Sequence, residues 1–188
     1  MCEYEDQLLF VSRFKVENRL EMLIEAAALL RSSHPGLAVW LVGEGIRDQT
    51  ELRALVDGLD LSEVVQFVGP VYDEHALAPW FLTADVFCYP SNLGLSVLHA
   101  LGYGVPVVTG DREDRNPPEW QTVESGTNGL LFAAGSVTEL AGALDTLFKD
   151  EALRRRYGEA GRQRVLANYS VEHMVAGLKE AVLYASRL

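Results

Sequence analysis

Short apolar runs alternate with amphipathic stretches along the chain. Residues 8–11 and 37–42 are almost wholly apolar, which is typical of central parallel strands covered on both faces. Between them, apolar residues recur at helical spacing from Leu20 to Leu30. The alternation predicts a doubly wound α/β sheet with right-handed crossovers. Further strands are expected at 64–68, 85–89, 106–108 and 129–132, and further helices at 49–59, 76–83, from Gly94 onward, 137–149, 151–168 and 171–186.

Length and composition favour one domain. The chain has 188 residues, of which 48% are hydrophobic, and this is enough for a sizeable core. It contains no internal repeat, no low-complexity run and no obvious linker. We therefore expect residues 1–188 to form a single Rossmann-like domain with about six mostly parallel strands and helices at its C-terminal end.

Charge and cysteine usage narrow the class of partner and compartment. The net charge of −11 argues against a nucleic-acid or anionic-membrane surface. Cys88 lies in an apolar strand and is expected to be buried and reduced, which fits a reducing compartment. No apolar run approaches the roughly 18 residues that span a bilayer, and no export signal is evident. A cytoplasmic protein is the expectation.

The loop after the strand at 85–89 is the first candidate site. We expect a helix whose first turn holds Gly94 and Leu95, so that its free N–H groups face the loop. Those donors and the positive end of the helix dipole suit a phosphate, and Gly94 leaves room for a close approach. In a parallel sheet this loop also lies where ligands bind.

Two arginines flank the loop after the first strand. Arg13 and Arg19 would face the same crevice as Gly94, and guanidinium groups suit bidentate binding of phosphate oxygens. Arg19 could instead cap an exposed helix start, although a cation there is unfavourable unless an anion offsets it. His99 is either a satisfied core histidine or a donor to a ribose or phosphate oxygen. Ser91 either caps the helix or a turn, or touches the ligand.

Other chemistries find little support in the sequence. Gly43-Glu44-Gly45 lacks the third glycine of a dinucleotide fingerprint and is best interpreted as a tight turn. The four histidines and two cysteines show no metal-ligand spacing. We expect neither a metal nor a cofactor.

A series of motifs runs through nearly the whole chain: Phe10-Val11-Ser12-Arg13, Leu23-Ile24-Glu25-Ala26, Leu41-Val42-Gly43-Glu44-Gly45, Phe67-Val68-Gly69, Tyr89-Pro90-Ser91, Gly94-Leu95, Gly102-Tyr103-Gly104-Val105-Pro106-Val107-Val108 and Asn128-Gly129-Leu130-Leu131. In this order they resemble the C-terminal domain of GT-B glycosyltransferases, most closely the "glycosyl transferases group 1" (family 4) type. Such domains bind a nucleotide-sugar donor, while a separate N-terminal domain binds the acceptor.

The resemblance implies a role for each matched position. Arg13 would contact the donor diphosphate, and the amides of Gly94 and Leu95 would hold the distal phosphate and the sugar. Ser12 would belong to the same donor site, and backbone around Val68 and Gly69 would meet the nucleobase. The resemblance also implies a metal-independent, retaining transfer that serves glycan or polysaccharide synthesis. The isolated domain is expected to be inactive without its N-terminal half, through which it could also associate peripherally with a membrane.

Two departures keep other functions open. The family's lysine falls on Asn18, with Arg19 next to it as a substitute. The family's two glutamates fall on Ser91 and His99, and we interpret His99 as a replacement donor to ribose or phosphate. A non-catalytic nucleotide-binding or scaffold module is therefore the alternative, and a sugar-nucleotide epimerase of the same architecture is a weaker one.

Overall fold

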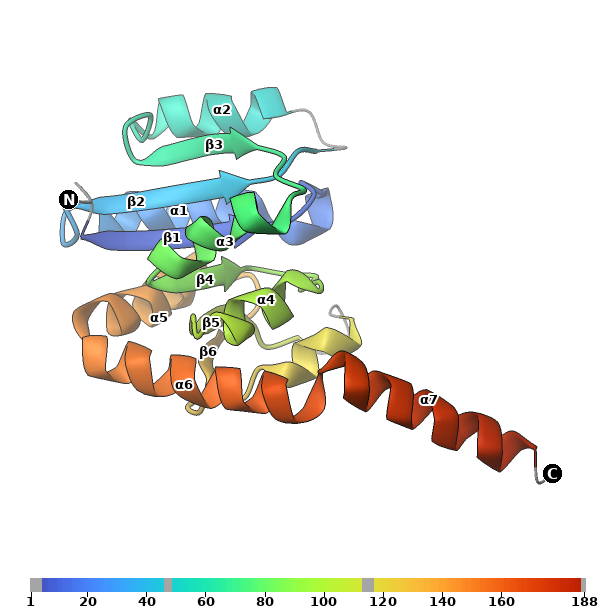
Figure 1. Cartoon of the computed structure of the whole chain (residues 1–188). Helices are drawn as coiled ribbons and strands as arrows, with labels where there is room; N and C mark the ends of the chain where they lie inside the picture. The colour runs from blue at the N-terminus through green and yellow to red at the C-terminus, as the bar shows by residue number, and fades with distance from the viewer. Residues whose placement is uncertain (1–4, 46–48, 113–116, 187–188) are drawn as a thin grey trace.

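The structure is a computed structural model that describes residues 5–45, 49–112 and 117–186. Six strands form one parallel sheet in the order β3-β2-β1-β4-β5-β6 (Figure 1). This confirms the doubly wound α/β fold, with a sheet that is parallel throughout. The strands are β1 (Asp6–Val11), β2 (Leu37–Val42), β3 (Val65–Gly69), β4 (Val86–Tyr89), β5 (Val107–Gly110) and β6 (Gly129–Phe132).

Helices cover both faces of the sheet. In Figure 1, α1 and α5 lie behind the strands and α3 and α4 lie in front of them. Every residue of β4 and β5 is buried, which explains why the central strands are continuous apolar runs. The helices are α1 (Leu20–Leu30), α2 (Gln49–Gly58), α3 (Glu74–Thr83), α4 (Ser96–Gly102), α5 (Val137–Lys149), α6 (Glu151–Asn168) and α7 (Val171–Ala185), with two short 3₁₀ helices, η1 (Val16–Asn18) and η3 (Pro118–Thr122).

The start of α4 differs from the sequence prediction. A first turn containing Gly94 and Leu95 was expected, but α4 begins at Ser96 and Leu95 occupies its N-cap position. The carbonyls of Gly94 and Leu95 accept the first N–H bonds, from Val97 and Leu98. Gly94 and Leu95 thus belong to the turn that leads into the helix. The predicted helix start was wrong by two residues. The turn before α4 already has a helical backbone conformation at Leu95, so the sequence does not distinguish this turn from the helix.

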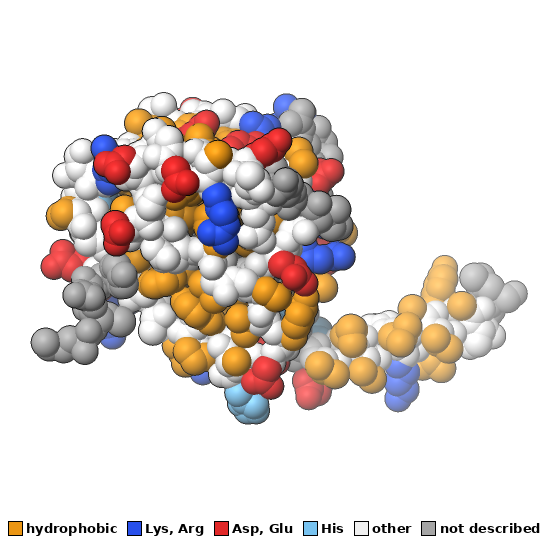
Figure 2. All heavy atoms as spheres, turned by 90° about the horizontal axis from the view of Figure 1, so that it is seen from above, with side chains coloured by type: hydrophobic (Ala, Val, Ile, Leu, Met, Phe, Trp, Pro, Cys, Tyr) orange, Lys and Arg blue, Asp and Glu red, His pale blue; other side chains and the backbone are white. Residues whose placement is uncertain are grey.

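Helix α7 leaves the body of the molecule. It has no buried residue, and it projects away from the sheet with hydrophobic side chains along its length (Figures 1 and 2). The exposed apolar residues recur at helical spacing. Among the described residues, none of the helices combines the length and the apolar character that crossing a bilayer requires. The apolar positions of α7 include Val171, Met174, Val175, Leu178 and Val182.

Two glycines let α6 approach the turn between α4 and β5. A Cβ atom built on Gly158 would lie 1.9 Å from the carbonyl oxygen of Gly104. Gly104 has a φ of +79°, a conformation that favours glycine. The contact is backbone against backbone, so no flexible side chain can move aside. Close packing of α6 on α4 therefore depends on the missing side chain at Gly158.

Gly158→Ala should lower the free energy of unfolding by about 1–3 kcal/mol, because the new methyl group forces the two backbones apart. The matched control is Gly142→Ala in α5, where a Cβ would meet nothing within 4 Å. That variant should be neutral or stabilising by up to about 1 kcal/mol, since alanine favours a helix interior over glycine. Urea unfolding of both variants measures the difference. Equal stabilities would contradict the packing argument.

A buried histidine joins three elements at the amino end of the sheet. His34, in the turn before β2, lies with Nδ1 2.8 Å from Asp6 Oδ2 and Nε2 2.9 Å from Asp145 Oδ1. Asp145 belongs to α5 and also accepts a hydrogen bond from Lys149. The hydrogen bonds from Lys149 and His34 lower the pKa of Asp145. This network ties β1 and α5 to the connection between α1 and β2.

Asp145→Asn should reduce stability at pH 7 by about 1 kcal/mol, because it weakens the bond to a buried ring. A carboxyl whose pKa is lowered by folding stabilises fully above its ordinary pKa of about 3.9 and loses that contribution as the pH falls through the folded value. Urea unfolding should thus show wild type and variant converging at about pH 3 or below. Glu63→Gln, at an exposed position, is the control and should show no such convergence. A constant gap between Asp145→Asn and wild type would refute the linkage.

Candidate functional site

The strand order reverses between β1 and β4. β1 is followed by β2 and β3 on one side of the sheet, and β4 is followed by β5 and β6 on the other. The loops after β1 and β4 therefore diverge and leave a crevice at the carboxyl ends of these strands. Ligands of open α/β sheets bind at this position.

The hydroxyl of Tyr89 connects the two loops of the crevice. Tyr89 lies at the end of β4, and its hydroxyl donates to Ser12 Oγ over 2.9 Å. The same oxygen accepts a hydrogen bond of 2.8 Å from Asn18 Nδ2. Asn18 is fully buried, and its Oδ1 accepts the N–H of Lys15 over 2.8 Å. Burial raises the pKa of Tyr89, so the hydroxyl stays protonated and keeps donating to Ser12.

An apolar pocket of about 160 Å³ opens beside this network. The loops after β1, β2 and β3 form its walls, and they are joined by a bond of 2.9 Å from Phe14 N to Glu44 O and one of 2.8 Å from Gly43 N to Gly69 O. A Cβ on Gly43 would lie 1.9 Å from the carbonyl oxygen of Ser12, so only glycine allows the first two loops to run together. The lining residues are Val11, Ser12, Arg13, Val42, Gly43, Glu44, Pro70, Val71 and Tyr72.

Charged groups stand at the rim of this apolar pocket. The hydroxyl of Tyr72 donates to Glu44 Oε1 over 2.9 Å. This hydrogen bond and the negative charge of Glu44 raise the pKa of Tyr72, whereas the positive charge of Arg13 lowers it. Arg13 also lowers the pKa of Tyr89. Arg13 lines the apolar pocket itself, next to Ser12 of the crevice network.

A second, more polar pocket of about 310 Å³ lies on the other side of the loop after β1. It is lined by Glu17, Arg19, Ser91 and Asn92, so it joins the loops after β1 and β4. Arg19 has a φ of +57° at the start of α1, and its Nε lies 2.6 Å from Glu21 Oε1. This pairing offsets the unfavourable position of a cation at a helix start. Ser91 is half-buried here and does not cap α4, whose N-cap residue is Leu95.

The other predicted residues lie around these two pockets. A Cβ on Gly94 would lie 3.6 Å from the Tyr89 hydroxyl, so the Gly94 backbone borders the crevice network. Leu95 is largely exposed at the start of α4. Val68 and Gly69 end β3 and line neither pocket, although the next residues, from Pro70 to Tyr72, line the apolar one.

His99 is placed apart from both pockets. Its Nδ1 lies 3.8 Å from Glu74 Oε2 at the start of α3, and its ring centroid lies 5.9 Å from that of Phe81. The ring is partly exposed and packs between α4 and α3. These contacts with Phe81 and Glu74 are those of a satisfied histidine, and the role of His99 as a donor to a ribose or phosphate oxygen stays a prediction.

Four residues of the site were not identified from the sequence: Asn18 as a buried support, Tyr89, Glu44 and Tyr72. Asn18 and Tyr89 lie 71 positions apart, and no spacing in the sequence indicates their contact. A signal did exist for Tyr72, since it lies two residues after Gly69-Pro70, which end the third strand and lead into a loop at the carboxyl edge.

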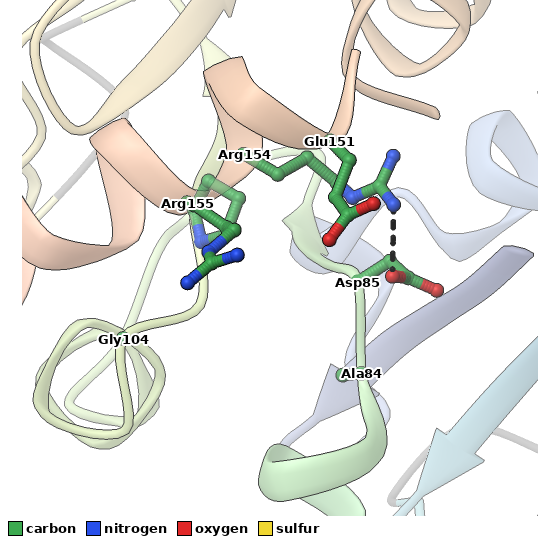
Figure 3. Close-up of a pocket in the computed structure, with 7 residues that line it drawn as sticks. Ala84, Asp85, Gly104, Glu151, Arg154 and Arg155 are labelled. Atoms are coloured by element: carbon green, nitrogen blue, oxygen red, sulfur yellow. Dashed lines mark ion pairs between the residues drawn. The ribbon is translucent and has the colours of Figure 1, made fainter. Parts of the chain in front are cut away.

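A third pocket lies at the opposite end of the sheet, before β4 and β5 (Figure 3). There Arg154 of α6 approaches Asp85 to 3.3 Å and donates to the carbonyls of Leu147 and Phe148. Burial raises the pKa of Asp85. These bonds join α5, α6 and β4, which is a structural role. Within residues 5–45, 49–112 and 117–186, no group of three His, Cys, Asp or Glu side chains could hold a metal ion.

Comparisons with known proteins identify the family of the chain. Residues 5–150 match the family described as "Glycosyl transferases group 1". The chain belongs to this family. The chain is 31% identical to the lipopolysaccharide core biosynthesis glycosyltransferase LpsE of Rhizobium meliloti. The match covers 88% of this chain and 46% of LpsE. The D-inositol 3-phosphate glycosyltransferase of an Arthrobacter species is 34% identical over 85% of the chain and 37% of that protein.

Solved structures agree on the GT-B fold and on the half of it that the chain represents. Anabaena HepE in complex with UDP superposes with a TM-score of 0.82 at 22% identity, over 95% of this chain and 48% of HepE. The C-terminal domain of LpcC from Francisella tularensis superposes with a TM-score of 0.77 at 21% identity, covering 89% of this chain and 88% of that one. The chain thus has the fold of the C-terminal half and spans about half the length of the relatives it matches.

Tyr89→Phe should destabilise the domain by about 1–3 kcal/mol, because the buried amide of Asn18 loses its partner. The control is Tyr157→Phe, at a tyrosine that is likewise buried but lies outside the crevice network. Thermal and urea unfolding should show a clear loss for the first variant and almost none for the second. Similar losses for both would mean that the Tyr89 hydroxyl does not hold the crevice together.

Proposed function

We propose that this chain is the donor-binding, C-terminal half of a retaining glycosyltransferase that uses a nucleoside-diphosphate sugar. The observation that carries the proposal is the pair of pockets on either side of the loop after β1. One is apolar and suits a planar base, and the other is polar and contains Arg19. Pockets that hold a complete ligand usually measure about 300–1,000 Å³, and neither of these pockets exceeds the lower end of that range. A single extended ligand would therefore occupy both pockets.

The chemistry follows from charge. During transfer, negative charge builds on the departing diphosphate as its bond to the sugar breaks. Arg13 and Arg19 stabilise that charge, and the N–H groups of Gly94 and Leu95 donate to the phosphate nearest the sugar. The two guanidinium groups would supply positive charge without a metal ion. The backbone N–H groups are preoriented by the turn into α4, so little reorganisation accompanies the reaction.

The altered positions of the family pattern have a physical interpretation. Asn18 is buried and bonded to Tyr89, so it supports the loop and leaves the cationic role to Arg19. Ser91 lies beside Arg19 and offers a neutral hydroxyl to the sugar. His99 pairs with Glu74 and lies apart from both pockets, so its role as a donor to a ribose or phosphate oxygen rests on the family resemblance.

An N-terminal half of the protein would complete the enzyme. The chain spans about half the length of its relatives, and the apolar stripe of α7 has no covering element among the described residues. In Figure 1 the strand arrows and α7 point to the same side, where the crevice lies. A second domain on that side would cover α7 and position the acceptor. By analogy with LpsE, which is named for lipopolysaccharide core biosynthesis, we propose a role in glycan or polysaccharide synthesis, in the cytoplasm.

A non-catalytic nucleotide-binding or scaffold module is the second candidate. It is favoured by one observation, the presence of Ser91 and His99 where the family pattern has two glutamates. Such a module would keep the base and phosphate contacts without turnover. Assaying sugar transfer and donor hydrolysis after joining this chain to its N-terminal half distinguishes an enzyme from a binder.

Calorimetric titration of the chain with UDP, GDP and ADP should reveal binding of at least one of them. Arg13→Ala and Arg19→Ala should each weaken the tightest of these by about tenfold, because each removes a charge-assisted hydrogen bond to phosphate. Arg162→Ala, at an exposed position of α6, is the matched control and should leave the affinity unchanged. The proposal fails if none of the three nucleotides binds, or if all three variants behave alike.

A further inference from the structure

The hydrogen bonds that join Asn18, Tyr89 and Ser12 run in a fixed direction. The backbone N–H of Lys15 can only donate, and it lies 2.8 Å from Asn18 Oδ1. The other end of the amide, Nδ2, therefore faces the hydroxyl oxygen of Tyr89, at 2.8 Å. Because Nδ2 also can only donate, the Tyr89 oxygen accepts this bond and its own proton goes to Ser12 Oγ, 2.9 Å away.

The Ser12 hydroxyl is the last member of this series of bonds. A serine hydroxyl carries one proton and two lone pairs. Its oxygen accepts the bond from Tyr89, so one lone pair is occupied. The proton of Ser12 takes no part in the series. Ser12 is half-buried and lines the apolar pocket, so a bound ligand could accept this proton.

The Ser12 hydroxyl lies close to the groups assigned to the diphosphate. Ser12 and its neighbour Arg13 line the same pocket. A Cβ built on Gly94 would lie 3.6 Å from the Tyr89 hydroxyl, and Ser12 Oγ lies 2.9 Å from that same oxygen. The Gly94 backbone and the Ser12 hydroxyl thus border one atom. A phosphate held by the turn into α4 would lie near both.

We propose that Asn18 and Tyr89 are positioning residues that direct the Ser12 hydroxyl, so that it donates its proton to a phosphate oxygen of the nucleotide-sugar donor. This inference rests on the proposed function. Hydrogen bonds in series polarise one another, which strengthens the last hydroxyl as a hydrogen-bond donor. The bond from Tyr89 also restricts the rotation of the Ser12 hydroxyl before the ligand binds, which lowers the entropy lost on binding.

The first measurement is the affinity of the chain for whichever of UDP, GDP and ADP wild type binds most tightly. Ser12→Ala should weaken this binding by about tenfold, because it removes a hydrogen bond to a charged oxygen. The control is Ser33→Ala, at an exposed serine in the turn before β2, at the opposite end of the sheet. This variant should bind the nucleotide as wild type does.

The second measurement reverses the series of bonds. In Asn18→Asp the carboxylate still accepts the N–H of Lys15 but must also accept the proton of Tyr89, which then accepts the proton of Ser12. Binding should weaken by about tenfold or more where Ser12 is present, and by about threefold or less in the Ser12→Ala background. The added charge, or a looser loop, would act equally in both backgrounds.

Tyr89→Phe in the same two backgrounds is a second variant, in case Asn18→Asp does not fold. It leaves the Ser12 hydroxyl without its orienting bond. Nucleotide binding should weaken by about threefold where Ser12 is present and stay unchanged in the Ser12→Ala background. Thermal unfolding of each variant establishes that it is folded at the temperature of the titration.

The outcomes separate this inference from the proposed function. If wild type binds none of the three nucleotides, the proposed function itself is lost. If wild type binds one and Ser12→Ala binds it equally well, the Ser12 contact is refuted and the proposed function stands. If the changes at Asn18 and Tyr89 weaken binding by the same factor with and without Ser12, these residues only support the loop, and their positioning role is refuted.

Discussion

A single phenolic hydroxyl holds the functional edge of this domain together. Tyr89 reaches from the end of β4 to Ser12 and Asn18 in the loop after β1, and so bridges the point where the strand order reverses. At such a point no ladder of backbone hydrogen bonds joins the loops, because they diverge from the ends of their strands. A buried side-chain network takes over this task, and its strength comes from the absence of competing water.

The same network explains how the domain differs from the general pattern of its family without losing the crevice. Where a lysine is expected, Asn18 turns inward and becomes part of the scaffold. Arg19 follows it in the left-handed conformation, is paired with Glu21, and opens onto the polar pocket. Asn18 therefore supports the loop as a neutral, buried residue, and the neighbouring Arg19 places a positive charge at the polar pocket. Arg13 and Arg19 thus lie on a loop that the bond between Asn18 and Tyr89 anchors.

Most of the fold could be predicted from local patterns. Continuous apolar runs indicated the buried parallel strands, and residues at helical spacing indicated one-faced helices such as α1 and α5. The error at Gly94 and Leu95 concerned a capping turn, where local preferences for turn and helix overlap. Arg13, Arg19 and Gly94 were identified as candidates because their loops follow strands, and parallel strands bring those loops to one edge.

The sequence by itself determined the alternation of strands and helices and the membership of the family, and it made Arg13 and Arg19 candidates, since each depends on local order or on short motifs. Tertiary structure alone decided that Asn18 would be buried against Tyr89, that Glu44 would hold Tyr72, and that Arg19 would face Ser91. These contacts join residues from different loops. Their formation depends on the strand order and on the close approach of backbones at Gly43, and neither is encoded in the spacing of the residues that meet.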